Sequence, residues 1–225
     1  MEQAVEILRA VHIAAGFLAL AVFWLPIAVP KGNAIHRRAG LVYVYAMFAV
    51  AVTALAIAPL RLVLWPREAW GRPIFLAYIA LLSFTSAFYG WRVLKQKQRK
   101  TPHEGRWDLA VPALLLVSTL ALAGYGLSTG FKLALYFVPV GLLVSVPQLR
   151  VLRSAPVSKT WWLVEHLSVM LVSCIATLTA FLVVNVGRLT GSSGSPLVWL
   201  APTFVIVPLI IYWQRLFKAG RGRGR

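Results

Sequence analysis

Acidic residues are scarce in this chain of 225 residues. Asp and Glu number 6 against 23 Lys and Arg residues, so the formal net charge at pH 7 is +17. Charged residues of both signs make up only 13% of the chain, whereas soluble globular domains contain about 25%. So few charges exclude the surface of an ordinary soluble domain, and so few carboxylates limit the choice of acidic ligands.

Cysteine is almost absent as well. The one cysteine, Cys174, lies inside an apolar stretch, which excludes an intramolecular disulfide. The chain also contains no HExxH, HxxxH or CxxC pattern. The commonest sequence signals of a zinc site or a redox dithiol are therefore missing.

Apolar residues are what the chain has in excess. They make up 60% of it, with a mean hydropathy of +0.77, and a helix that crosses a bilayer needs about 20 of them in succession. Seven stretches meet this requirement: residues 10–29, 39–60, 73–94, 107–128, 131–152, 161–185 and 196–217. We therefore expect an all-α, multi-pass membrane protein with one seven-helix domain over residues 1–217 and a basic, disordered tail over residues 218–225.

The basic residues divide unequally between the two ends of these predicted helices. Seventeen of the 23 lie at the ends where the first, third, fifth and seventh helices finish, and 6 lie at the opposite ends. Because short loops rich in Lys and Arg stay in the cytoplasm, this pattern predicts an outside N-terminus and a cytoplasmic C-terminus. The same residues flank apolar stretches, which indicates contact with anionic lipid headgroups and excludes nucleic acid as the partner.

Ionisable side chains within or beside the apolar stretches are candidates for function, because a bilayer makes them costly. These candidates are His12, His36, His103, Glu104, Asp108, Glu165 and His166. The predicted topology leaves His12 alone near the outer surface and brings the other six to the cytoplasmic boundary. One hypothesis is a transition-metal site, since zinc, iron and copper accept imidazole and carboxylate ligands. Its ligands would be His36, His103, His166, Glu165 and Asp108.

A haem b site is the second form of this hypothesis, because membrane b-type cytochromes hold haem between two axial histidines. His12 lies about 4.5 Å along its helix from Arg9, whereas His166 lies about 28 Å from the outer end of its own helix, so these two cannot ligate one iron. The open alternatives are one inner haem between His166 and either His36 or His103. His36 and His103 both lie outside their predicted apolar stretches, so their depth in the membrane is unfavourable for sharing an iron with His166. Arg37 and Arg38 would then pair with the haem propionates.

Two functions without a cofactor also stay open. His166, Ser173 and Thr177 share one helix face with small residues, which is typical of either a proton or solute path or a helix-packing seam. A transporter or channel predicts a water-accessible cavity beside Ser173 and Thr177. A structural or assembly subunit predicts instead that Asp108 stabilises a helix N-terminus and that Glu165 pairs with an arginine.

Several short motifs occur in order along the chain. They are His12-x3-Gly16, Lys31-Gly32-x3-His36-Arg37-Arg38-x-Gly40, Glu165-His166-x3-Met170, Thr179-Ala-Phe-Leu-Val-Val-Asn185 and Trp199-Leu-Ala-Pro-Thr203, with Pro208 and Ile211-Tyr-Trp213 near the end. This set resembles a family of uncharacterised bacterial multi-pass membrane proteins, a domain of unknown function that spans nearly the whole chain. The resemblance implies a seven-helix protein of the bacterial cytoplasmic membrane. It implies no activity.

Overall fold

The computed structural model describes residues 2–103, 105–156, 158–190 and 196–218. Its elements are α1 (Glu2–Val22), α2 (Trp24–Ala28), α3 (Ala34–Leu64), the 3-10 helix η1 (Arg67–Ala69), α4 (Gly71–Arg92), the 3-10 helix η2 (Val93–Gln96), α5 (Arg106–Thr129), α6 (Lys132–Arg153), α7 (Trp161–Thr190) and α8 (Pro196–Lys218). No strand occurs in these ranges. Seven helical stretches are long and apolar enough to cross a membrane, which confirms the predicted seven-helix architecture.

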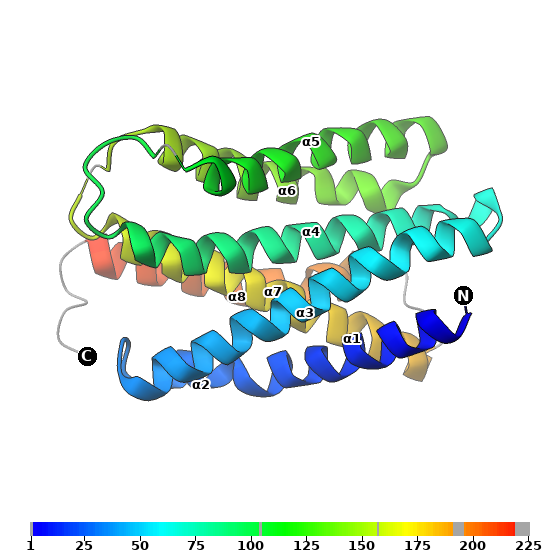
Figure 1. The fold of residues 1–225 in the computed structure, drawn as a ribbon, viewed down its shortest axis with the longest axis horizontal. Coiled ribbons are helices and arrows are strands. Elements are labelled where there is room, and N and C mark those ends of the chain that lie inside the picture. The colour runs from blue at the N-terminus through cyan, green and yellow to red at the C-terminus, as the bar shows by residue number, and fades with distance from the viewer. Residues whose placement is uncertain (1, 104, 157, 191–195, 219–225) are drawn as a thin grey trace.

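The helices run roughly parallel to the long axis of the bundle, with α4 and α7 between two flanks (Figure 1). The hairpin of α5 and α6 forms one flank, and α1 with α3 forms the other, while α8 packs on α7. The start of α1 and the end of α8 lie at opposite ends of the bundle (Figure 1). The side of the membrane that each end faces stays a prediction.

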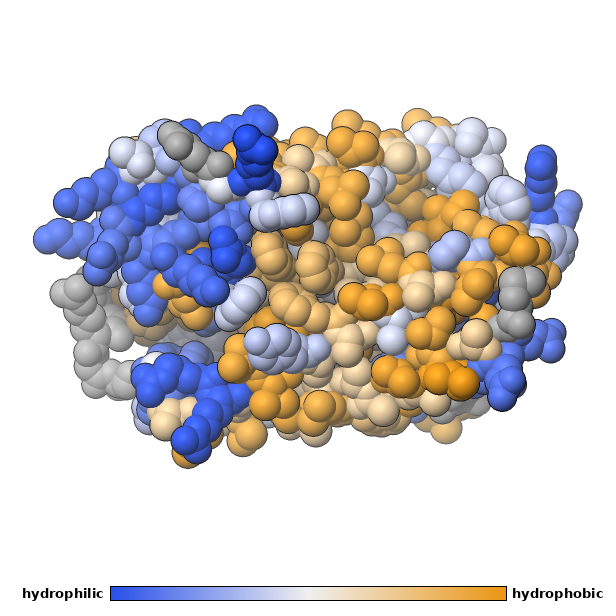
Figure 2. Space-filling model, in the orientation of Figure 1, coloured by the Kyte–Doolittle hydropathy of each residue, from blue (hydrophilic) through white to orange (hydrophobic). Residues whose placement is uncertain are grey.

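Surface hydropathy divides the molecule along the same axis. Figure 2 shows a broad apolar belt around the middle and hydrophilic residues at both ends, with many more of them at the end that carries the α2–α3 turn. This is the end where the sequence gathers most Lys and Arg residues. An apolar belt of this kind suits contact with lipid tails.

Two helices begin earlier than the apolar stretches predicted. The first starts at Glu2 instead of residue 10, and α3 starts at Ala34 instead of residue 39. The earlier start of α3 brings His36 into the first turn of a helix, although it lies outside the predicted apolar stretch. Of the disordered tail predicted over residues 218–225, Lys218 belongs to α8, and residues 219–225 lie outside the described residues.

Candidate functional site

A cavity of about 670 Å³ lies between α2, α3, α4, α7 and α8. We call it the histidine cavity, because His36 from α3 and His166 from α7 both line it. Its volume is within the range of about 300–1,000 Å³ that is typical of small-molecule and cofactor sites. Three tryptophans, Trp91, Trp162 and Trp213, provide much of its apolar wall. The cavity therefore combines aromatic surface with two imidazoles.

The turn between α2 and α3 fixes the position of His36. Gly32 adopts φ +82°, a conformation that glycine tolerates and other residues rarely adopt. Asn33 then caps α3, since its side-chain oxygen accepts a hydrogen bond from the backbone N–H of His36 at 2.7 Å. The His36 ring turns back toward α2, where its Nδ1 lies 3.1 Å from the Pro26 carbonyl oxygen. That carbonyl is available because the residue four positions further on is Pro30, which has no N–H.

A neighbouring helix fixes His166 in the same way. Its Nδ1 lies 2.7 Å from the carbonyl oxygen of Gly90, in the last turn of α4. The absence of a side chain at Gly90 permits this approach, because a Cβ there would lie 2.7 Å from Met170 Sδ and 2.9 Å from Val169 Cγ2. Small residues often serve this purpose between membrane helices.

The two rings lie close together, with 6.3 Å between their centroids and 64° between their planes. A carbonyl oxygen can only accept a hydrogen bond, so each Nδ1 must carry the proton. In the neutral ring Nε2 then keeps its lone pair, and no described residue donates a hydrogen bond to Nε2 of either ring. Histidines that bind metals usually present this arrangement, with one nitrogen held by a carbonyl and the other free to ligate.

The rim of the histidine cavity is basic. Lys31, Arg37 and Lys97 line it, and no Asp or Glu does so in the part of the chain that the structure describes. The Lys31 Nζ lies 5.5 Å from the centre of the Trp213 ring, and the Lys97 Nζ lies 4.4 Å from that of Trp162. Partial burial lowers the pKa of the Lys31 ammonium, as expected for a cation without an anionic neighbour. The rim suits a ligand with negative charge at its edge.

Asp108 lies in a separate polar cluster that joins α4, η2 and α5. Its carboxylate accepts hydrogen bonds from Arg92 Nε at 2.6 Å, Arg92 Nη2 at 2.9 Å, Gln96 Nε2 at 3.2 Å and His103 Nε2 at 2.6 Å. The side chain of Asp108 is buried, and it lies in the first turn of α5, where a negative charge is favourable. We interpret this cluster as a structural ion pair.

The predicted five-residue metal site is therefore not found. Within the described ranges, no group of three or more His, Cys, Asp or Glu side chains is placed to hold a metal ion. His103 and Asp108 bond to each other, whereas His36 and His166 line the histidine cavity. The sequence predicts one membrane boundary for all of them and an unfavourable depth for His36 beside His166, whereas in the structure these two rings line the same cavity.

The remaining candidates have different surroundings. Glu165 accepts a hydrogen bond from the Tyr89 hydroxyl at 3.1 Å. Arg37 lines the histidine cavity, whereas its neighbour Arg38 is exposed and is not one of the lining residues. Glu104 lies outside the described residues. Of the two arginines expected to meet propionates, only Arg37 lies on the rim.

His12, in the middle of α1, has hydrogen-bond partners in α3. Its Nδ1 lies 3.0 Å from the Val50 carbonyl oxygen and 3.0 Å from Thr53 Oγ1, both in α3. These contacts join α1 to α3. They give His12 a packing role apart from the histidine cavity, which it does not line.

The polar face of α7 beyond His166 forms a packing seam. The Tyr43 hydroxyl lies 2.9 Å from Ser173 Oγ and 3.2 Å from Thr177 Oγ1, and all three side chains are buried. The histidine cavity extends along α7 as far as Cys174, but neither Ser173 nor Thr177 lines it. The transport hypothesis needed a water-accessible cavity at these two residues, so this arrangement favours packing.

Sequence reasoning missed several functional groups around the histidines. Lys31 and Lys97 were counted only as topology signals, although both line the histidine cavity. The Pro26 carbonyl was not considered at all. One signal was available, because Gly32 followed by Asn33 before an apolar stretch is a helix-start pattern that would have extended α3 to include His36.

Fold and site together define the class of this protein: a multi-pass helical membrane protein with a histidine-lined cavity at one end of its bundle. Comparison of the chain with protein-family models, curated proteins and solved structures gives no match. The resemblance to a bacterial membrane family stays a prediction. Function therefore has to be argued from the site.

Proposed function

We propose that this protein binds one haem b in the histidine cavity, with His36 and His166 as the axial ligands. The observation that carries this proposal is the histidine pair itself. Both rings line one cavity, and each has its Nδ1 held by a backbone carbonyl, which leaves two Nε2 lone pairs for one iron. Two histidines are enough to hold a haem iron, whereas a zinc or copper site of the kind first expected needs three or more ligands.

The dimensions of the site fit this ligand set. Two imidazoles that would hold one iron have to lie close together. The separation of the His36 and His166 centroids is 6.3 Å. The tryptophan wall suits the porphyrin plane, and the basic rim of Lys31, Arg37 and Lys97 suits two propionates.

Two protein ligands on one iron also limit the chemistry. A bound haem would supply a one-electron redox couple, and an iron held by both His36 and His166 would not be open to oxygen. The chain's own residues would hold the group, orient its ligands and shield it from water. The proposed role is therefore electron transfer or haem handling for an assembly process, with no substrate bound at the iron.

The location of the site belongs to the same proposal. We place the protein in a bacterial cytoplasmic membrane with the histidine cavity near the cytoplasmic face. The unequal distribution of Lys and Arg residues supports this orientation, and so does the hydrophilic end in Figure 2, which is the end of the α2–α3 turn.

The direct test is a visible spectrum of the full chain, purified in detergent and titrated with haemin. We expect saturation at one haem per chain, a Soret band and the sharp α band of a six-coordinate haem after reduction. His36→Ala or His166→Ala should weaken haem binding by at least roughly 100-fold, because loss of even a supporting residue around a metal ligand costs about 10–100-fold. His12→Ala and His103→Ala are matched controls that should bind haem normally.

Three results would refute the proposal. The first is no Soret band at saturating haemin. The second is an equal loss of binding in the two control variants, which would mean that the substitutions act through the fold. The third is stoichiometric binding of copper or zinc that depends on His36 and His166 while haem does not compete.

A further inference from the structure

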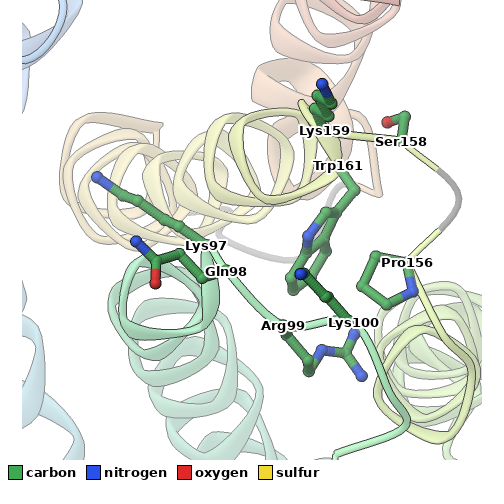
Figure 3. A pocket seen from close by; sticks show the side chains of 8 residues that line it. All are labelled: Lys97, Gln98, Arg99, Lys100, Pro156, Ser158, Lys159 and Trp161. Carbon is green, nitrogen blue, oxygen red and sulfur yellow. The ribbon is translucent and has the colours of Figure 1, made fainter.

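A second cavity, of about 620 Å³, lies between the loop after η2 and the start of α7 (Figure 3). We call it the basic pocket. Its polar and aromatic lining residues include Lys97, Arg99, Lys100, Ser158, Lys159 and Trp161. None of the described residues that line it is acidic, and the two ion pairs found between described residues involve none of its cations. The pocket therefore has four cationic side chains and no acidic one among its described lining residues.

Arg99 is the fixed element of the basic pocket. Its guanidinium donates from Nη1 to the carbonyl oxygens of Leu152 at 3.0 Å and Ser154 at 3.1 Å, and from Nη2 to that of Val151 at 2.8 Å. These bonds tie the loop to the end of α6. The guanidinium carbon also lies 4.6 Å from the centre of the Trp161 ring, so Arg99 and Trp161 form one rigid wall.

Two donors on this wall have no acceptor. Arg99 Nε and Trp161 Nε1 are both buried without a hydrogen-bond partner, and Trp161 is only 7% exposed. Buried N–H groups nearly always have an acceptor. Figure 3 shows Lys100 beside these two residues, while Lys97 and Lys159 extend from either side of the pocket. The pocket thus has an excess of positive charge and two N–H donors without an acceptor, while Gln98 and Ser158 are its neutral polar lining residues.

We infer that the basic pocket binds one phosphate-bearing anion. A phosphate group carries the negative charge and the several acceptor oxygens that lysines, a guanidinium and an indole N–H require. Trp161 is the first residue of α7, so the pocket lies where a predicted membrane span begins, which is the level of lipid phosphates. The phosphate could belong to a lipid headgroup or to a soluble ion, and the chemistry of recognition is the same.

This inference does not rest on haem binding. Among the described residues, Lys97 alone lines both cavities. Variants that avoid Lys97 therefore test the basic pocket alone, and either proposal can fail without the other.

The experiment measures binding to the full chain by native mass spectrometry after detergent exchange. The probes are phosphatidylglycerol, phosphatidylcholine as the neutral-headgroup control, and inorganic phosphate as a competitor. Lys100→Gln with Lys159→Gln should lower the affinity for one phosphatidylglycerol by roughly 20- to 30-fold, since each basic residue near an anionic surface contributes about a factor of 5. Trp161→Phe, which removes the N–H donor together with the five-membered ring that carries it, should lower it by roughly tenfold.

The matched control is Arg150→Gln with Arg153→Gln, which removes two exposed charges of α6 at the same end of the bundle. It should leave the affinity within a factor of 3. Saturable binding of one phosphatidylglycerol that phosphate does not displace supports a lipid headgroup, and displacement by phosphate supports a soluble anion. Binding that is not saturable, or that falls equally in the control, would overturn the inference, and so would an unchanged affinity in Trp161→Phe.

Discussion

Replacement of Asp108 offers the sharpest test of how the end of the bundle is held together. Its side chain is 1% exposed and accepts four hydrogen bonds from Arg92, Gln96 and His103. Asp108→Ala would leave these donors without their acceptor. The loop that contains His103 would also lose its attachment to α5.

The size of the effect follows from the exposure of the partners. Removal of one member of a buried ion pair costs about 3–5 kcal/mol. Arg92 is 31% exposed and His103 is 20% exposed, so water recovers part of what these two groups lose. We therefore expect Asp108→Ala to lower the free energy of unfolding by about 3 kcal/mol. Asp108→Asn, which keeps the shape and one carbonyl acceptor, should cost roughly half as much.

The measurement is equilibrium unfolding of the purified chain in mixed detergent, with Glu68→Gln as the control. Glu68 is an exposed acid in η1, at the other end of the bundle, and its replacement should change stability by less than about 0.5 kcal/mol. A double-mutant cycle with Arg92→Gln should give a coupling energy of about 1–3 kcal/mol. A cost below about 1 kcal/mol for Asp108→Ala, or additive single effects, would show that the cluster is not a buried ion pair.

The remaining predictions concern packing and topology. Tyr43→Phe removes the hydroxyl that bonds to α7 and should lower the free energy of unfolding by about 1 kcal/mol; an unchanged free energy of unfolding would contradict this. Gly90→Leu should separate α4 from α7, withdraw the Gly90 carbonyl from His166 and weaken haem binding about 10–100-fold. The control in the same titration is Gly124→Leu, at a site where an added Cβ meets no atom within 4 Å. A fluorescent protein fused after Arg225 should be bright in the cytoplasm, and an active periplasmic phosphatase at that position would reverse the proposed orientation.

The number of helices could be predicted from the sequence because apolar run length decides it. Each crossing needs a run of fixed minimum length, and every one of the seven runs becomes a helix. Hydrophobicity does not locate helix ends, however, since polar residues can continue a helix beyond the apolar belt. The first turn of α3 shows this: Asn33 caps it, and His36 belongs to it although neither residue is apolar.

The candidate site could be predicted only by its depth. Sequence position gives the height of a residue along the membrane normal, and it correctly gathers His36, His103 and His166 at one end. Which residues meet depends on the rotation of each helix and on which helices are neighbours. His103 turns to Asp108, five residues away, whereas His36 meets His166, 130 residues further along the chain. No local pattern contains that second pairing.

The chemistry of helix ends explains why the site lies where the topology signals lie. Carbonyls near a helix terminus have no intrahelical partner, so they are free to accept a hydrogen bond from a histidine ring. Pro26 at the end of α2 and Gly90 at the end of α4 supply such carbonyls on two neighbouring elements. Basic residues gather at the same ends, which are the proposed cytoplasmic boundary. A histidine pair held by helix ends therefore has basic residues around it. The residues proposed to orient the chain in the membrane thus lie where an anionic cofactor is proposed to bind.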